Sequence, residues 1–124
     1  MSRRRIERLN EQLKREVVDI LRREVRDPRV GTVTVTDVET APDLSSARIY
    51  VYAMDATDGR EELMEGLRAA APFVRRELGQ RLHIRRAPEL LWAWDESFEQ
   101  AQRIERLLAE VRPSEPDDDD DGAV

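Results

Sequence analysis

The 124-residue sequence predicts an α+β fold in which a small β-sheet carries helices on one face. Two kinds of apolar pattern support this prediction. Stretches with apolar residues at spacings of three and four are typical of amphipathic helices, whereas alternating apolar and polar residues are typical of half-buried strands. Along the chain these patterns occur in the order helix, strand, strand, helix, kink, helix, strand and an extra terminal helix. The length suits one domain with a single core.

The first part of the chain contains one predicted helix and two predicted strands. An apolar stripe from Ile6 to Val25 predicts a long helix that starts after the N-cap Ser2 and ends at Asp27-Pro28. The strands are "TVTVTDVE" (residues 32–39) and "ARIYVYA" (residues 47–53). The turn-forming segment "APDLSS" between them predicts a hairpin.

A proline interrupts the helical pattern in the middle of the chain. Pro72 has no N–H to donate, and its ring clashes with the carbonyl group four residues earlier, so the helix must bend or restart there. The break is expected at Ala71-Pro72, and a second helix is predicted to start at Pro72, where the missing N–H costs nothing. Asp58 and Glu61 form the predicted capping box of the helix before the kink. The predicted buried positions are Leu63, Leu67 and Ala70 before the proline and Val74, Leu78 and Leu82 after it.

The end of the chain contains a third strand, a helix and an acidic segment. In "ELLWAWD", Leu90, Trp92 and Trp94 alternate with Leu91 and Ala93, which predicts a strand, and Ser97 with Gln100 predicts the cap of a terminal helix. The segment "SEPDDDDDGAV" has no apolar residue able to anchor it and is expected to be disordered. We therefore predict a folded domain over residues 1–111 and a disordered acidic tail over residues 112–124. The terminal helix is expected to bury a stripe of Phe98, Ala101, Ile104, Leu108 and Val111.

The composition argues against several function classes. The chain has no cysteine, which excludes disulfides, thiolate chemistry and cysteine-ligated metals. Its one histidine, His83, has no second catalytic group near it in the sequence, so a hydrolytic or phosphoryl-transfer enzyme would depend on His83 alone. We expect no enzymatic activity, no cofactor and no metal. No apolar run approaches the roughly 20 residues of a membrane span, so we expect a soluble, cytoplasmic protein.

Basic residues point to a nucleic-acid partner. The net charge of −6 is misleading, because residues 115–121 hold six of the 27 acidic side chains. Two stretches, residues 1–29 and 75–86, are locally basic. The arginines after Pro72 are expected to face solvent together, and the start of a helix there would add the amides of Phe73 and Val74 as phosphate donors. The candidate RNA-binding residues are Arg4, Arg5, Arg8, Arg75, Arg76, Arg81, Arg85 and Arg86.

Two alternatives to RNA binding stay open. Tyr50 and Tyr52 share one face of a strand, where packing under a helix is favoured over stacking on bases. The whole chain can also be a protein-interaction domain that docks through its acidic tail, with the arginines serving solubility and no direct RNA role.

Several short motifs occur in a fixed order over about residues 3–108: a D-P-R turn, a V-T-V-T strand, a P-D-L turn, a P-E-L strand entry and a D-x-S helix start followed by R-I-x-x-L-L. In these motifs the sequence resembles the ribosome-binding factor A family of bacterial small-subunit assembly proteins. The resemblance implies a type II KH-like fold. It further implies a protein that binds the immature small ribosomal subunit and its 16S rRNA, aids maturation of the rRNA ends, and is released with a ribosome-assembly GTPase. We also expect a monomer. In that family an Ala-x-Gly kink replaces the Gly-x-x-Gly loop of KH domains, and here Ala70, Ala71 and Pro72 align with it.

Overall fold

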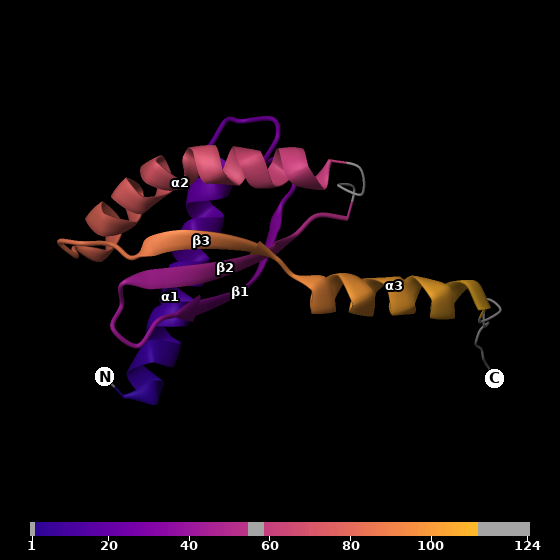
Figure 1. The fold of residues 1–124 in the computed structure, drawn as a ribbon, viewed down its shortest axis with the longest axis horizontal. Helices are drawn as coiled ribbons and strands as arrows, with labels where there is room; N and C mark the ends of the chain where they lie inside the picture. The colour runs from indigo at the N-terminus through magenta and orange to yellow at the C-terminus, as the bar shows by residue number, and fades with distance from the viewer. Residues whose placement is uncertain (1, 55–58, 112–124) are drawn as a thin grey trace, which may run out of the picture.

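The structure, a computed structural model, describes residues 2–54 and 59–111. A three-stranded sheet has the order β1-β2-β3, with β1 antiparallel to β2 and β2 parallel to β3. Helix α1 packs against β1 and α2, and α2 packs against β3 (Figure 1). The predicted α+β class and element order are confirmed. The elements are α1 (Arg3–Arg23), β1 (Thr34–Thr40), β2 (Ser46–Tyr52), α2 (Arg60–Leu82), β3 (Glu89–Trp94) and α3 (Glu96–Val111).

The core lies between the sheet and the two helices α1 and α2. Alternate side chains of β2 enter it, because Ala47, Ile49 and Val51 are fully buried while Arg48 is exposed. The parallel register places the side chains of β3 beside them, with Ile49 opposite Trp92. The predicted stripes of α1 and α2 supply the rest of the core. The fully buried helical side chains are Leu13, Val17, Ile20, Leu67, Val74 and Leu78.

Helix α1 starts where the sequence predicts and ends earlier. The Ser2 side chain accepts a hydrogen bond from the amide of Arg5, which confirms it as the N-cap. The helix ends at Arg23. The predicted end at Asp27-Pro28, four residues later, was therefore wrong. The amides of Glu24 and Val25 both bond to the carbonyl of Ile20, and this closes the last turn before the proline is reached.

The segment after α1 is a turn built by an ion pair. The Asp27 carboxylate accepts hydrogen bonds from the backbone amide of Arg29, at 2.9 Å, and from its guanidinium, at 2.7 and 3.1 Å. These bonds lower the pKa of Asp27. The turn lies so close to α2 that a Cβ added at Gly66 would approach Arg29 Cβ to 3.0 Å. The D-P-R sequence therefore fixes a backbone turn against a glycine of α2.

A bulge in β1 changes the alternation that the sequence predicts. The pairing with β2 shifts between Val35 and Asp37, and the strand starts at Thr34 instead of Thr32. Strict alternation counted from the buried Val35 would bury residue 37, but after the shift Val38 is buried and Asp37 is exposed. The displaced Thr36 links three elements, since its hydroxyl donates to Asp95 and its carbonyl accepts from Lys14 of α1.

Helix α2 runs without interruption through Pro72. The prediction that a second helix starts at Pro72 was wrong, since this residue lies inside one α-helix, Arg60–Leu82. The axis bends between the two halves of α2 (Figure 1), as the loss of an i→i−4 bond requires. Pro72 and Arg68, whose carbonyl loses that bond, are both exposed, so water can solvate the freed oxygen. The predicted capping residue Asp58 lies outside the described residues, and the N-cap is Gly59.

The buried positions of α2 also show one continuous helix. Leu63, Leu67, Val74 and Leu78 are buried, and Ala70 packs against the core. Their spacings of four, three, four and four keep one phase across the proline. The bend therefore changes the direction of α2 without changing the face that it buries.

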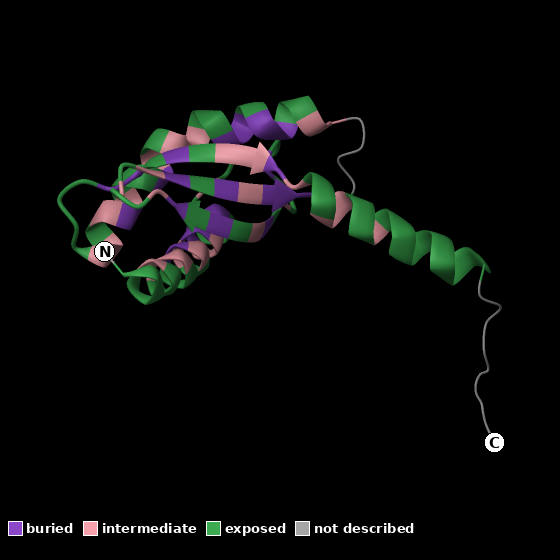
Figure 2. Cartoon of the chain, turned by 60° about the horizontal axis from the view of Figure 1, so that its bottom comes forward, coloured by how far each residue is buried: buried purple, intermediate pink, exposed green. Residues whose placement is uncertain are grey.

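Helix α3 differs most from its prediction. Its cap is Asp95, which accepts hydrogen bonds from the amide of Phe98 and the hydroxyl of Ser97, so the predicted cap at Ser97 was wrong. Burial alone would raise the pKa of Asp95, but these bonds and the one from Thr36 outweigh it and lower the pKa. Phe98 packs on Tyr52, with ring centroids 5.2 Å apart. The expected core stripe was otherwise wrong, because α3 extends away from the sheet and contains no buried residue (Figure 2).

Candidate nucleic-acid interface

A basic groove lies where α2 ends and the chain turns toward β3. It is open, holds about 570 Å³, and brings together Pro72 and four of the eight predicted arginines. Both the bent helix and the turn after it contribute to its walls. The groove is lined by Pro72, Arg75, Arg76, Gly79, Gln80, Ile84, Arg85, Arg86 and Ala87.

Helical spacing places the α2 residues on one face of the helix. Residues 72, 75, 76, 79 and 80 follow the i, i+3, i+4, i+7, i+8 pattern. This face is separate from the buried one that contains Val74 and Leu78. Gln80 and Gly79 were not among the predicted site residues, although the same spacing counted from Pro72 identifies both.

A left-handed residue brings the last two arginines to the groove. His83 ends α2 with φ 56°, and the amide of Ile84 bonds to the carbonyl of Gly79 at 3.0 Å. This closing turn is common at helix ends, although glycine is the usual residue there. It reverses the chain, so that Arg85 and Arg86 lie beside the helix they follow.

The four groove arginines differ in how firmly the protein holds them. The Arg75 Nε donates to the carbonyl of Ala87 at 3.0 Å, and the Arg76 guanidinium lies 5.9 Å from the centre of the Phe73 ring. Within the described ranges, neither Arg85 nor Arg86 has a hydrogen bond or ion pair, and both are exposed. Two arginines are thus oriented by the protein, and two keep all their donors for a ligand.

The backbone does not supply the phosphate site predicted after Pro72. Only the first four amides of a helix lack a partner within it. Because α2 begins at Arg60, the amides of Phe73 and Val74 are interior, and the expectation that they bind phosphate was wrong. Arginine side chains are therefore the principal donors of the groove.

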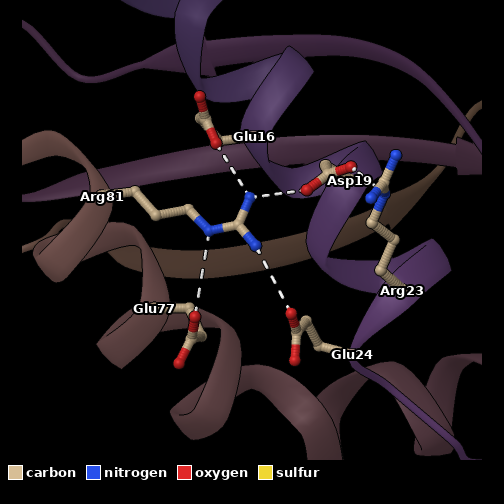
Figure 3. A network of polar contacts seen from close by, with 6 residues as sticks. All are labelled: Glu16, Asp19, Arg23, Glu24, Glu77 and Arg81. Carbon is tan, nitrogen blue, oxygen red and sulfur yellow. Dashed lines mark hydrogen bonds and ion pairs between the residues drawn. The ribbon is translucent and has the colours of Figure 1, made fainter.

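Arg81 lies outside the groove, in a network of carboxylates (Figure 3). Its guanidinium is 3.0 Å from Glu16 and 2.7 Å from Asp19, both on α1. Glu24 and Glu77 lie 3.7 and 3.8 Å away. The hydrogen bond from Arg81 lowers the pKa of Asp19, and the bonds to Asp19 and Glu16 raise the pKa of Arg81. The expectation that Arg81 faces solvent with the other arginines was wrong, since it joins α1 to α2.

Replacing Arg81 with Gln is expected to lower the thermal midpoint at pH 7 by about 2–5 °C. The substitution leaves four carboxylates facing one another without their shared cation. The lowered pKa of Asp19 contributes stability above its unfolded value of about 3.9, and this contribution is lost as the pH falls through the folded pKa. The difference between wild type and variant should therefore shrink below about pH 4.

Thermal melts followed by circular dichroism at pH 7 and pH 3 test this expectation. Arg15→Gln is the matched control, because Arg15 is exposed on α1. Equal midpoints for the two variants at pH 7 would show that the network does not hold α1 to α2.

The N-terminal arginines form a second basic surface. Arg4, Arg5 and Arg8 are exposed on the first turns of α1. They do not line the groove. In Figures 1 and 2 the first turns of α1 and the end of α2 both lie at the end of the molecule opposite α3. The two basic surfaces can therefore meet one extended polyanion without involving α3.

Other candidates have structural explanations. Tyr52 is buried and packs against Trp94 and Phe98, which confirms the packing interpretation for this residue. Tyr50 is half-buried and donates to Glu39. His83 is exposed at the helix end. The described residues contain no group of three or more acidic, histidine or cysteine side chains suited to a metal, and none of the described helices is long and apolar enough to cross a membrane.

Fold and site together define a small α+β protein with an arginine-lined groove at a bent helix. The family model of "Ribosome-binding factor A" matches residues 5–108. Two proteins of that name support the match. One, from Halothermothrix orenii, is 42% identical over 98% of this chain and its own full length, and one from Microcystis aeruginosa is 44% identical over 95% of this chain and 94% of its own. The chain belongs to the ribosome-binding factor A family.

Solved structures agree with the sequence comparison. The crystal structure of ribosome-binding factor A from Thermus thermophilus has a TM-score of 0.64 at 28% identity and covers 72% of this chain and 93% of its own. A solution structure of a Thermotoga maritima protein described as a putative ribosome-binding factor A has a TM-score of 0.66 at 28% identity, with coverages of 72% and 85%. A homology model of the Thermus thermophilus protein, fitted into a cryo-electron microscopy map of a 30S complex, has a TM-score of 0.59 at 28% identity, with coverages of 70% and 91%.

Proposed function

We propose that this protein is an assembly factor that binds the immature small ribosomal subunit through its 16S rRNA. The observation that carries the proposal is the convergence of Arg75, Arg76, Arg85 and Arg86 on one groove. The relative from Thermus thermophilus, fitted into the map of a 30S complex, supports the choice of partner.

The chemistry of the groove suits structured RNA. Guanidinium groups contact phosphate oxygens through paired N–H donors, and such contacts position a protein on RNA without reading its sequence. Double-helical RNA is recognised largely by shape and by its backbone. Arg4, Arg5 and Arg8 extend the proposed contact surface along the same end of the molecule, and Arg81 is left out because its carboxylate partners occupy it.

The resemblance to the family supports a finer proposal. The protein acts in the cytoplasm as a monomer without enzymatic activity, and it aids late maturation of the subunit and of the rRNA ends. Its release involves a ribosome-assembly GTPase. Pro72 takes the place of the usual glycine of the family at the kink, so the bent α2 meets RNA through side chains and not through a bare glycine backbone.

Sedimentation of a lysate from the source cell tests this function. We expect the protein to migrate with free small subunits and to be absent from translating ribosomes. Its absence from the subunit fractions would contradict the proposal. Binding to isolated subunits should also weaken steeply with salt, whereas the alternative, a protein-interaction domain without an RNA role, predicts a weak salt dependence.

A further inference from the structure

Helix α3 has an apolar face that nothing in the described part of the chain covers. Ile104, Leu107, Leu108 and Val111 are 51%, 53%, 49% and 79% exposed. The helix extends away from the sheet and from the other two helices in both views (Figures 1 and 2). A group of large apolar side chains left in water is typical of a surface that binds a partner.

A different face of α3 attaches it to the domain. Phe98 packs on Tyr52, and Trp94 donates a hydrogen bond to Glu99 at 3.0 Å. At about 100° per residue, Leu107 lies roughly half a turn around the helix from Phe98, and Val111 and Ile104 lie about 140° and 120° from it. Leu108 is nearer, at about 80°, but on the side of Phe98 opposite to Glu99. Most of the apolar face therefore points away from the contacts that hold α3.

Charge selects the kind of partner. Helix α3 carries four acidic and two basic side chains, a net charge of −2, and the sequence that follows it, residues 112–124, adds six acidic and one basic side chain. Residues 96–124 together therefore carry −7 and residues 1–95 carry +1. This acidic end of the chain disfavours RNA phosphates and a second copy of itself as partners. The apolar face is also only about 12 Å long. A face of this length buries less than the roughly 1,000 Å² of a stable protein interface, so we expect charged contacts to add to it.

We propose that α3 is an arm that docks on a basic protein of the small ribosomal subunit. The apolar face enters a groove on that protein, and the acidic side chains, including Glu105 and Glu110, meet its basic surface. The arm and the arginine groove lie at opposite ends of the molecule (Figure 1), so rRNA and protein can be bound together. This inference rests on the proposed function for the location of the partner.

Binding of two arm variants to two probes tests the inference. The probes are intact small subunits and protein-free 16S rRNA. Leu107→Gln with Leu108→Gln should weaken binding to intact subunits by at least about tenfold and leave binding to the rRNA unchanged. Glu105→Lys with Glu110→Lys should weaken binding to subunits and strengthen binding to the rRNA, because the new charges favour phosphate.

Controls separate this inference from the proposed function. Glutamine is a good helix former, so circular dichroism should show unchanged helix content, and Met54→Gln, at a side chain 66% exposed outside the arm, should bind both probes normally. Normal binding by the leucine variant to both probes, equal losses on both, or self-association that this variant abolishes would overturn the docking arm alone. Wild-type protein that binds neither probe would overturn the proposed function and the arm together.

Discussion

Replacing Arg85 and Arg86 with Gln should weaken binding to the immature small subunit by about 10- to 100-fold, as the loss of charged hydrogen bonds to phosphate predicts. Neither side chain is tied to a described residue by a hydrogen bond or ion pair, so folding should be unchanged. The slope of log affinity against log salt concentration should shrink by roughly 0.7–0.9 for each phosphate group that the variant no longer neutralises. Affinities measured at several salt concentrations give this slope.

The matched control for the groove is the pair Arg103→Gln and Arg106→Gln on α3, measured on protein-free 16S rRNA, where the proposed arm has no protein partner and we expect no loss of affinity. Both residues are exposed and lie on the arm, far from the groove. Equal losses from the two pairs would reduce the groove to non-specific charge. An Arg85 and Arg86 variant with normal affinity and an unaltered slope would leave Arg4, Arg5 and Arg8 as the remaining candidates.

Truncating Leu67 to Ala should destabilise the fold by about 2–5 kcal/mol. Leu67 is fully buried, at the centre of the stripe that α2 turns toward the sheet. The substitution removes buried apolar surface and leaves a cavity that the surrounding core fills only in part. Chemical denaturation of wild type and variant measures the difference.

Leu107→Ala is the matched control for Leu67→Ala, because it removes the same atoms from a side chain that is 53% exposed. Its effect on stability should stay within about 0.5 kcal/mol. Similar midpoints for the two variants would show that the described register of α2, or the exposure of α3, is wrong.

The candidate site was predictable in part. Arg75, Arg76 and Arg81 were predicted from their spacing off the buried stripe, and Arg85 and Arg86 from their position just past the helix. The groove contains four of these five arginines. Arg81 obeys the same spacing rule but lies beside Glu16 and Asp19, which are more than 60 residues away in the sequence. No local pattern reports whether a carboxylate from another helix will reach a given guanidinium.

Two features of the fold show the same limit. The missing N–H of proline located the bend at Pro72. A kinked helix and a restarted helix differ only in how the turns on either side of the proline pack. Here the buried residues of α2 keep one helical phase across the bend. Similarly, Asp95 and Ser97 are both good N-caps by residue type. The choice of Asp95 followed from its position at the end of β3, within reach of Thr36 on β1.

By itself the sequence determined the order of helices and strands and which face of each is apolar, because periods of 3.6 and 2 follow from backbone geometry. Tertiary structure alone decided what each face would meet. The apolar stripe of α2 packs against the sheet, whereas the stripe of α3 is exposed to water, because the Asp95 cap and the packing of Phe98 direct α3 away from the domain. Amphipathicity states that a surface is apolar, and only the positions of distant elements decide whether it is covered.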